Sequence, residues 1–395
     1  MTDRSPARFP FDAVLFDLDG TLVATDRFWP DAARAGALRA FEELGLEREL
    51  PTRRDWMGMV GYPLEDGFAR VFEDLDGPAR AVLMERCVEE EHLALRAGHA
   101  VLLPGAQAAL DELSARGVRL GIASNCGRQY LDAMVGGLGL ERWIEESRCL
   151  DSRGVHDKAG MIEDLLWTFD TRSAVMVGDR ISDRDAAWAN GLPHVHLARG
   201  FAEAGEVAQC EAVIDGLDEL LPRLDQRSAW LRNLIEQLDL MDVDSLALTG
   251  GPASGKTIMA RDLARELERL GRGCQVLGAK AADSASADAN RWRAALSGAA
   301  EAGALTLVEG RGLRELGLAD LARRTLVLEI SPAVARRRLA GRDARNGVPD
   351  AYQVAVEEPL RAACEAPWGG EPGATELRIP ADNPLGPGSG PPLEA

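Results

Sequence analysis

Lysine is scarce in this chain of 395 residues, which has 45 basic residues but only three lysines, Lys158, Lys256 and Lys280. The 64 acidic residues outnumber the basic ones and leave a formal net charge of -19. Nucleic-acid binding draws much of its affinity from Lys and Arg side chains that neutralise phosphates. The composition therefore argues against a nucleic-acid partner, whereas a small phosphorylated metabolite can still bind in a locally cationic pocket.

Cysteine and long apolar runs are also scarce. The six cysteines are scattered and form no C-x-x-C pair, which predicts neither a disulfide framework nor a zinc site. The five histidines show no spacing typical of a metal cluster or a catalytic dyad. No run of about 18 apolar residues occurs, and no basic segment followed by an apolar run opens the chain. We therefore expect a cytoplasmic protein that is neither secreted nor inserted in a membrane.

Short apolar segments alternate with helical patterns along the chain, which is typical of parallel sheets covered by helices. The expected strands are 13–17, 119–123, 174–177 and 195–197, then 246–249, 274–277, 305–308 and 326–330. The fold class is therefore α/β, with two Rossmann-like parallel-sheet domains. We expect these domains over residues 1–225 and 244–380, a helical connector over 226–243, and a disordered tail rich in Pro and Gly over 381–395.

The motif Asp17-Leu18-Asp19-Gly20-Thr21 follows the first expected strand. Two carboxylates at positions i and i+2 leave a strand end in a common direction, and Gly20 lets the backbone approach a ligand closely. One carboxylate of such a pair can attack phosphorus, while the other protonates the leaving oxygen and later activates water. A turn or helix cap rich in Asp is the alternative interpretation of this motif taken alone.

Later polar residues favour the catalytic interpretation. Ser124 and Asn125 end the second expected strand, Lys158 lies in the region that follows, and Asp179 and Asp183 come after the third. Open parallel sheets bind their ligands at the carboxyl ends of strands. We therefore expect these side chains to meet the two carboxylates of the first motif at one edge of the sheet.

In the order of these motifs, residues 11–222 resemble the haloacid dehalogenase superfamily of phosphohydrolases. The resemblance implies that Asp17 is the nucleophile, that Asp19 is the general acid and base, and that Lys158 steadies both the phosphate and the nucleophile. It also implies that the substrate phosphate accepts hydrogen bonds from Thr21 and Ser124, with Asn125 beside them.

The same resemblance implies a magnesium site. Asp17, Asp179 and the backbone carbonyl of Asp19 would bind Mg²⁺, with Asp183 supporting them. Two anionic partners that meet at one phosphorus need such a cation, because it screens their repulsion.

A largely helical segment over about residues 26–100 resembles the cap of this superfamily, in particular the cap of phosphoglycolate phosphatase and its relatives. A cap excludes water and contacts the part of the substrate beyond the phosphate. Within it, the loop from Gly58 to Gly67 offers Tyr62 as a substrate contact, with Arg53 or Arg54 as further candidates. A surface or packing role is the stronger expectation for each of these three.

A second motif runs from Gly250 through Gly255, Lys256 and Thr257, and satisfies G-x-x-x-x-G-K-[ST] in full. An expected strand precedes it and an expected helix, 258–270, follows it, which is the context that this motif requires. Such glycines let backbone N–H groups surround a β-phosphate, while the lysine reaches the β and γ oxygens. The hydroxyl of Thr257 would bind Mg²⁺, so we expect ATP or another nucleoside triphosphate here.

Over residues 244–375 the chain resembles the uridine kinase and phosphoribulokinase group of P-loop kinases. This resemblance rests on the motif at Gly250, on Glu309 at a strand end as a metal-site acid, and on an arginine-rich segment that contains Arg338 and Arg342. A solvated arginine face is the alternative for that segment. Asp283 is the candidate base for the acceptor hydroxyl, although it is displaced from the position that the group usually uses.

The sequence therefore predicts a bifunctional enzyme that combines an Mg²⁺-dependent phosphatase with an ATP-dependent kinase-like domain. Polynucleotide end repair, which uses the same pair of superfamilies, is the alternative within enzymes; the acidic charge argues against it. A further alternative is a phosphatase that a non-catalytic nucleotide-binding domain regulates. The substrates and the oligomeric state stay open.

Overall fold

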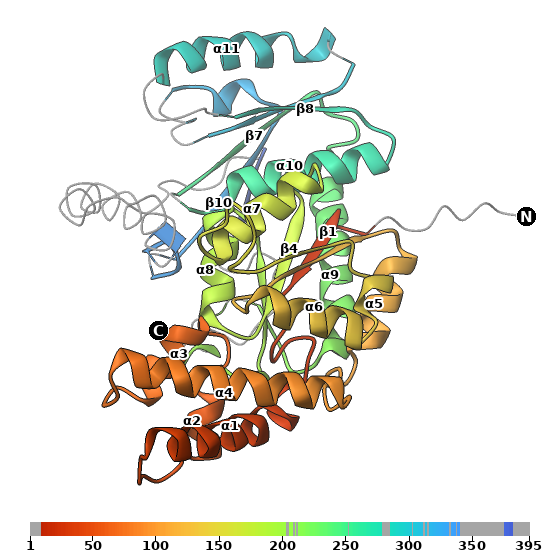
Figure 1. Cartoon of the computed structure of the whole chain (residues 1–395). Coiled ribbons are helices and arrows are strands. Elements are labelled where there is room, and N and C mark those ends of the chain that lie inside the picture. Colours follow the sequence, from red (N-terminus) through yellow and green to blue (C-terminus); the bar gives the residue numbers. More distant parts are fainter. Residues whose placement is uncertain are drawn as a thin grey trace, which may run out of the picture. The chain divides into compact units, whose positions relative to one another are not determined.

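A computed structural model describes residues 9–202, 205–207, 210, 212–251, 253–278, 285–301, 303–310, 313, 316–331, 333–336, 338–339 and 375–381 (Figure 1). The chain divides into two compact units, of which the first spans Phe11–Leu221 and the second begins at Pro222. Three residues singled out above, Lys280, Asp283 and Arg342, lie outside the described residues. The same holds for residues 382–395 of the expected tail.

The first unit is built on a six-stranded parallel sheet of order β3-β2-β1-β4-β5-β6. Its strands are β1 (Ala13–Phe16), β2 (Arg119–Ala123), β3 (Glu146–Arg148), β4 (Ala174–Gly178), β5 (His194–Leu197) and β6 (Val213–Ile214). The expected parallel α/β sheet is confirmed. The edge strands β3 and β6 were not expected, because they have only three and two residues and no residue of β3 is fully buried.

Helices cover this sheet: α5 (Ala106–Ala115), α6 (Arg128–Gly137), α7 (Lys158–Thr168) and α8 (Ile181–Ala189), with short 3-10 turns η2 (Leu140–Arg142) and η4 (Leu217–Glu219). The α7 and α8 helices pack on one face, where Met161, Leu165 and Ala187 join Leu15 and Met176 of the strands in one buried cluster. On α7 the exposed residues Glu163 and Thr168 lie on the other face, whereas no residue of α8 is fully exposed.

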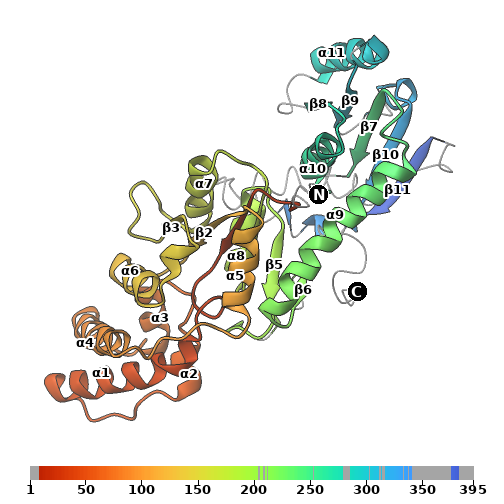
Figure 2. The same cartoon turned by 90° about the vertical axis from the view of Figure 1, so that its right-hand side faces the viewer.

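Helices also fill the segment 26–100: η1 (Thr25–Arg27), α1 (Trp29–Leu44), α2 (Arg53–Met57), α3 (Leu64–Val71) and α4 (Gly77–Arg96). Figures 1 and 2 show α1 and α4 side by side, away from the sheet. Gly36 makes this approach possible, since a Cβ there would lie 2.4 Å from the Cα of Cys87. Asp76 accepts from the N–H of Ala79 (2.9 Å) and so caps α4 at its N-terminus.

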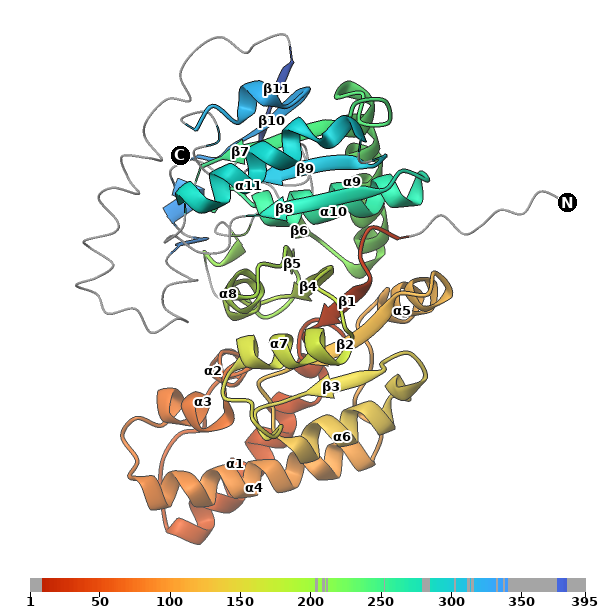
Figure 3. The ribbon, with the colours of Figure 1, turned by 90° about the horizontal axis from the view of Figure 1, so that it is seen from above.

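The second unit has a five-stranded parallel sheet of order β11-β10-β7-β9-β8. Its strands are β7 (Ser245–Gly250), β8 (Cys274–Gly278), β9 (Leu305–Glu309), β10 (Arg324–Glu329) and β11 (Glu376–Pro380), visible together in Figure 3. Its helices are α9 (Leu220–Gln237), α10 (Lys256–Arg269) and α11 (Ala285–Ser297), with turns η5 (Ala299–Glu301) and η6 (Ala319–Leu321). Figures 1 and 2 show α10 and α11 on opposite faces of the sheet.

The connector and the tail differ from their expected bounds. The helix expected over the connector 226–243 spans Leu220–Gln237 instead, and Pro222 is tolerated in its first turn, where a missing N–H costs no hydrogen bond. Ala381, expected in the tail, extends the strand β11 and donates its N–H to the carbonyl of Glu329 (2.6 Å). Among the described residues, no helix is both long and apolar enough to span a bilayer.

Candidate functional site

The register of the first sheet brings three polar strand ends together. Phe16, the last residue of β1, pairs with Ile122 of β2 and with Val177 of β4. The residues that follow these strands therefore emerge at the same edge. Asp17 stands there beside Ser124 and Asp179, as the sequence motifs predict.

Lys158 forms the centre of a buried cluster of charges at this edge. Its Nζ lies 2.8 Å from Asp17 Oδ1 and 2.5 Å from Asp183 Oδ1. Carboxylate oxygens of Asp17, Asp179 and Asp183 all lie within 4.8 Å of one another. One ammonium thus contacts two of three clustered carboxylates, and all three are buried.

The cluster has an excess of negative charge that a divalent cation would relieve. Burial raises the pKa of Asp17 to about 6, although Lys158 opposes the rise. Burial and the neighbouring Asp17 raise the pKa of Asp179 well above its usual value. Asp17 Oδ2 is buried and has no hydrogen-bond partner among the described residues. An orphaned carboxylate oxygen beside two further carboxylates fits a hard, oxygen-ligated ion such as Mg²⁺.

Glycines leave the space that these carboxylates occupy. A Cβ on Gly20, whose φ of +78° also favours glycine, would lie 2.5 Å from Asp179 Oδ2. A Cβ on Gly200 would lie 2.1 Å from the Cβ of Asp179, and one on Gly178 would lie 2.2 Å from Asp183 Oδ2. The backbone can therefore enclose the cluster only where no side chain is present.

Asp19 lies in a different environment from Asp17. Its Oδ1 accepts hydrogen bonds from the hydroxyls of Thr25 (2.6 Å) and Tyr130 (2.5 Å). Burial raises the pKa of Asp19 to about 6, and the two hydroxyls oppose that rise. A carboxyl group with such a pKa can exchange a proton near neutral pH.

The remaining residues predicted to bind phosphate lie near the cluster, but in different ways. Ser124 and Asn125 line a cavity of about 490 Å³, together with Asp17 and Asp19. Thr21 instead donates its hydroxyl to Asp179 Oδ1 (3.2 Å).

The helical segment 26–100 supplies the opposite wall of this cavity. Its contribution is mainly apolar and aromatic: Trp29, Met59, Val60, Tyr62, Leu64 and Val88. Glu91 of α4 also lines the cavity, and burial together with Asp19 raises its pKa well above the usual value. Burial therefore favours the protonated, uncharged form of Glu91 in the wall.

Two residues of the sheet edge hold the loop at Gly61. Asn125 Nδ2 donates to the carbonyl of Gly61 (3.0 Å), and the guanidinium of Arg180 donates to the carbonyl of Val60. The guanidinium carbon of Arg180 also lies 4.8 Å from the ring centre of Tyr62. The helical segment is thus fastened over the cavity. Of the candidates in it, Tyr62 lines the cavity, whereas Arg53 donates to the carbonyl of Asp26.

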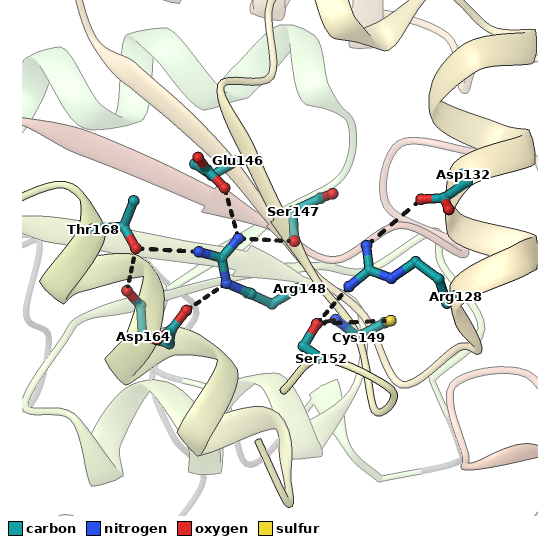
Figure 4. A network of polar contacts seen from close by, with 9 residues as sticks. All are labelled: Arg128, Asp132, Glu146, Ser147, Arg148, Cys149, Ser152, Asp164 and Thr168. Carbon is teal, nitrogen blue, oxygen red and sulfur yellow. Dashed lines mark hydrogen bonds and ion pairs between the residues drawn. The ribbon is translucent and has the colours of Figure 1, made fainter. Parts of the chain in front are cut away.

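Figure 4 shows a network that fixes α7, the helix that begins with Lys158. Arg148 at the end of β3 forms an ion pair with Asp164 of α7. In the adjoining turn, Ser152 Oγ accepts from Arg128 of α6 (2.7 Å). These contacts join α6, β3 and α7 and so position the ammonium.

In the second unit, the described residues Gly251 and Ala253–Gly255 lie between β7 and α10. Gly255 adopts φ 83° immediately before the first turn of α10, and Gly250 has φ 154°. Lys256 Nζ donates to the carbonyls of Gly251 (2.7 Å) and Gly250 (3.2 Å). The ammonium therefore lies over the loop, at the N-terminus of a helix, where anions are favoured.

The acid expected beside this loop is in place. Thr257 Oγ1 donates to Glu309 Oε1 (3.0 Å), at the end of β9. Arg338 donates to the carbonyl of Ala253 in the loop (2.9 Å). Of the residues predicted for this site, Lys256, Thr257, Glu309 and Arg338 are described, whereas Asp283 and Arg342 lie outside the described residues.

Several residues of the first site were not predicted from the sequence. Thr25 and Tyr130 reach Asp19 from segments with no motif of their own. Glu91 ends a run of three glutamates, which is typical of a solvated helix face. Helical periodicity along α4 could have separated it from its neighbours, because it follows the buried Leu83 and Cys87 at intervals of four.

Comparison with known proteins gives a consistent picture for the first unit. A family model described as haloacid dehalogenase-like hydrolase matches residues 14–196. The phosphoglycolate phosphatase of Rhodospirillum rubrum is 31% identical over 209 residues, which are 48% of this chain and 80% of that protein. The plasmid-encoded phosphoglycolate phosphatase of Cupriavidus necator is 31% identical over 224 residues, which are 54% of this chain and 93% of that protein.

Two further proteins are similar to part of this chain. An uncharacterized protein of Lacticaseibacillus casei is 32% identical over 133 residues, which are 33% of this chain and 57% of that relative. A solved structure of a predicted phosphoglycolate phosphatase from Haemophilus somnus has a TM-score of 0.49 and 19% identity, over 54% of this chain and 97% of that chain.

The first prediction concerns the space around Asp183. Gly178→Ala should lower the free energy of unfolding by about 1–3 kcal/mol, because the new methyl group would overlap a buried carboxylate. Gly136→Ala is the matched control, since a Cβ there meets nothing within 4 Å and its helix favours alanine. Urea unfolding of both variants gives the comparison. Equal stability of the two variants would contradict the geometry of the cluster.

The second prediction concerns the neutral Glu91. Its protonation stabilises the fold fully below the usual pKa of 4.5, and this contribution is lost as the pH rises toward the raised value. Glu91→Gln stays neutral at every pH. Between about pH 5 and about pH 8 the parent should therefore lose at least about 2 °C more in Tm than this variant. Glu85→Gln, at an exposed position of α4, should follow the parent; parallel losses in all three proteins would show that Glu91 is ionised.

Proposed function

Because the chain belongs to the haloacid dehalogenase-like hydrolase family, we propose that its first unit is an Mg²⁺-dependent phosphatase that hydrolyses a small phosphomonoester. The observation that carries this proposal is the buried cluster of three carboxylates around Lys158, with one oxygen of Asp17 unpartnered. Asp17 also lines the cavity in which an ester would bind.

The two carboxylates of the first motif divide the reaction. Asp17 attacks the phosphorus and forms an aspartyl-phosphate, while the P–O bond to the leaving alcohol breaks. Asp19, protonated beforehand, gives its proton to that alcohol oxygen. It then takes a proton from water, which attacks phosphorus and releases inorganic phosphate and Asp17. A pKa of about 6 for Asp19 suits both directions of proton transfer.

The surrounding polar groups orient the phosphate. We assign Lys158 to the nucleophile and the phosphate, since it already lies 2.8 Å from Asp17. Ser124 and Asn125 are assigned as hydrogen-bond donors to the phosphate oxygens. Thr21 is assigned to the same role, for which its hydroxyl would turn away from Asp179 Oδ1. In this assignment Asn125 also links the phosphate site to the helical segment, because its amide donates to the carbonyl of Gly61.

Asp17, Asp179 and the backbone carbonyl of Asp19 would hold Mg²⁺, with Asp183 supporting the site. The bound ion would supply positive charge that lowers the repulsion between the carboxylates and the phosphate.

The cavity supports a small organic phosphate as the substrate. Its volume of about 490 Å³ lies within the range of small-molecule sites. Two relatives are named phosphoglycolate phosphatases, so phosphoglycolate is the first compound to test. The apolar wall and the neutral Glu91 also suit esters with a larger, partly apolar body, such as phosphorylated polyols with an aromatic or alkyl group.

For the second unit we propose nucleotide binding with kinase-like phosphoryl transfer. Support comes from Lys256 over its loop and from the pair Thr257 and Glu309, which would bind a metal ion with ATP. Arg338, bonded to the loop, would contact the phosphates. A nucleotide-binding regulator of the phosphatase is the second candidate, because the base for an acceptor hydroxyl, Asp283, lies outside the described residues. End repair of polynucleotides is disfavoured by the net charge of -19.

The third prediction tests the nucleophile. Asp17→Asn should lower phosphate release by at least about 10²-fold, because an amide cannot form the covalent adduct. The panel contains phosphoglycolate and larger phosphomonoesters, and released phosphate is measured. Asp31→Asn, at an exposed position of α1, should keep full activity. Removal of Mg²⁺ with a chelator should abolish the parent's activity, and added Mg²⁺ should restore it; full activity of Asp17→Asn would refute the mechanism.

The fourth prediction tests the second unit. Lys256→Ala should raise the Kd for ATP by at least about tenfold, since the charge beside the β and γ oxygens is lost. Calorimetry measures binding, and Arg261→Ala on the exposed face of α10 is the control. Transfer of labelled phosphate to alcohols is measured with the same proteins. Binding without transfer would favour the regulator, and absence of binding in the parent would exclude both candidates.

A further inference from the structure

A second buried group of metal-binding side chains lies outside the phosphatase site. His194 and His196 project from the same face of β5, since they are two residues apart in a strand. Cys210, which follows β5 along the chain, joins them. Donor atoms of the three residues lie within 4.8 Å of one another, and all three residues are buried.

The contacts of the two imidazole rings do not compensate for the burial of their polar nitrogen atoms. Their exposed fractions are 1% and 0%, and none of their four ring nitrogens has a hydrogen-bond partner among the described residues. The backbone of Gly178 is a polar neighbour of His194. Buried polar groups are ordinarily paired, because unpaired ones cost free energy. Two such rings together indicate a missing partner.

Neighbouring charges do not provide that partner. Glu206 is the nearby carboxylate, but its oxygens accept from Arg180 Nε (3.2 Å) and from the N–H of Ile181. Burial lowers the pKa of His196 to about 4, and it lowers the pKa of His194 well below its usual value. Both rings are therefore neutral, which is the form that binds metal ions.

We propose that His194, His196 and Cys210 bind a thiophilic divalent transition-metal ion, of which Zn²⁺ is the representative. Two imidazole nitrogens and one thiolate are a common zinc ligand set, with a fourth position left for water or another group. Zinc bonds of about 2.0–2.3 Å place tetrahedral ligands about 3.3–3.8 Å apart. The three donors reach that spacing with side-chain movements of about 1 Å.

Such an ion would tie the segment after β5 to the sheet. Phe201, which also follows β5, contacts the carboxylate cluster, because its N–H donates to Asp179 Oδ2 (2.5 Å). Glu206 contacts Arg180, which holds the loop at Val60. The metal would stabilise these contacts without touching the substrate.

The test uses the full chain, stripped with a chelator and then titrated with Co²⁺ as a spectroscopic substitute for Zn²⁺. A cobalt ion bound to a thiolate in a tetrahedral site gives a near-ultraviolet charge-transfer band and intense visible bands. The oxygen-rich site at Asp17 lacks a thiolate ligand, so the near-ultraviolet band is specific for the cysteine. We expect the band in the parent, and its displacement by about one equivalent of Zn²⁺.

Variants assign the ligands. Cys210→Ser should abolish the near-ultraviolet band, and His194→Gln should weaken Zn²⁺ binding by at least about tenfold. The controls Cys274→Ser and His156→Gln, which change a cysteine of the second unit and an exposed histidine, should bind like the parent. Absence of the band in the parent would overturn the proposal. This result does not depend on whether the variants fold, because it is measured on the parent protein. Persistence of the band in Cys210→Ser would equally overturn it. These readouts do not depend on phosphatase activity, so they can fail while the proposed function holds.

Discussion

The contact of the Lys158 ammonium with Asp17 and Asp183 is the interaction on which the first site depends. Three carboxylates cannot share a water-poor edge without a counter-charge, because burial strongly disfavours isolated ions. One lysine offsets only part of that charge. Burial raises the pKa of Asp17, and the nearby carboxylate of Asp183 adds to the rise. The charge imbalance that weakens the isolated cluster is what a bound divalent cation would relieve.

This constraint extends into the surrounding backbone. Side chains are absent at Gly20, Gly178 and Gly200 because the carboxylates occupy the space that Cβ atoms would need. The helix that carries Lys158 is in turn held by the Arg148 network of Figure 4. The charged cluster around Lys158 therefore depends on β3, on the helices α6 and α7, and on three glycines. Its geometry is set by residues along the whole edge of the sheet.

The helical segment 26–100 acts on the same edge from outside. Asn125 and Arg180 fasten its loop through two backbone carbonyls, so closure of the cavity and arrangement of the polar strand ends are linked. In the second unit, the ammonium of Lys256 is held by carbonyl groups of its own loop and not by carboxylates. Both units place their lysine at the carboxyl end of a parallel sheet, where strand ends and helix N-termini converge.

The sequence by itself determined the α/β class, the helical segment, both lysine-bearing motifs and the residues Asp17, Asp19, Asp179 and Asp183, because each depends on local pattern and strand-end position. Only the tertiary structure decided that Tyr130 and Thr25 bond to Asp19, that Glu91 faces inward, and that β3 and β6 extend the sheet. It also brought His194, His196 and Cys210 together, although their spacing in the sequence suggests no metal site. The physical reason is that motifs encode contacts between neighbours along the chain, whereas burial and pairing across the sheet depend on segments far apart in sequence.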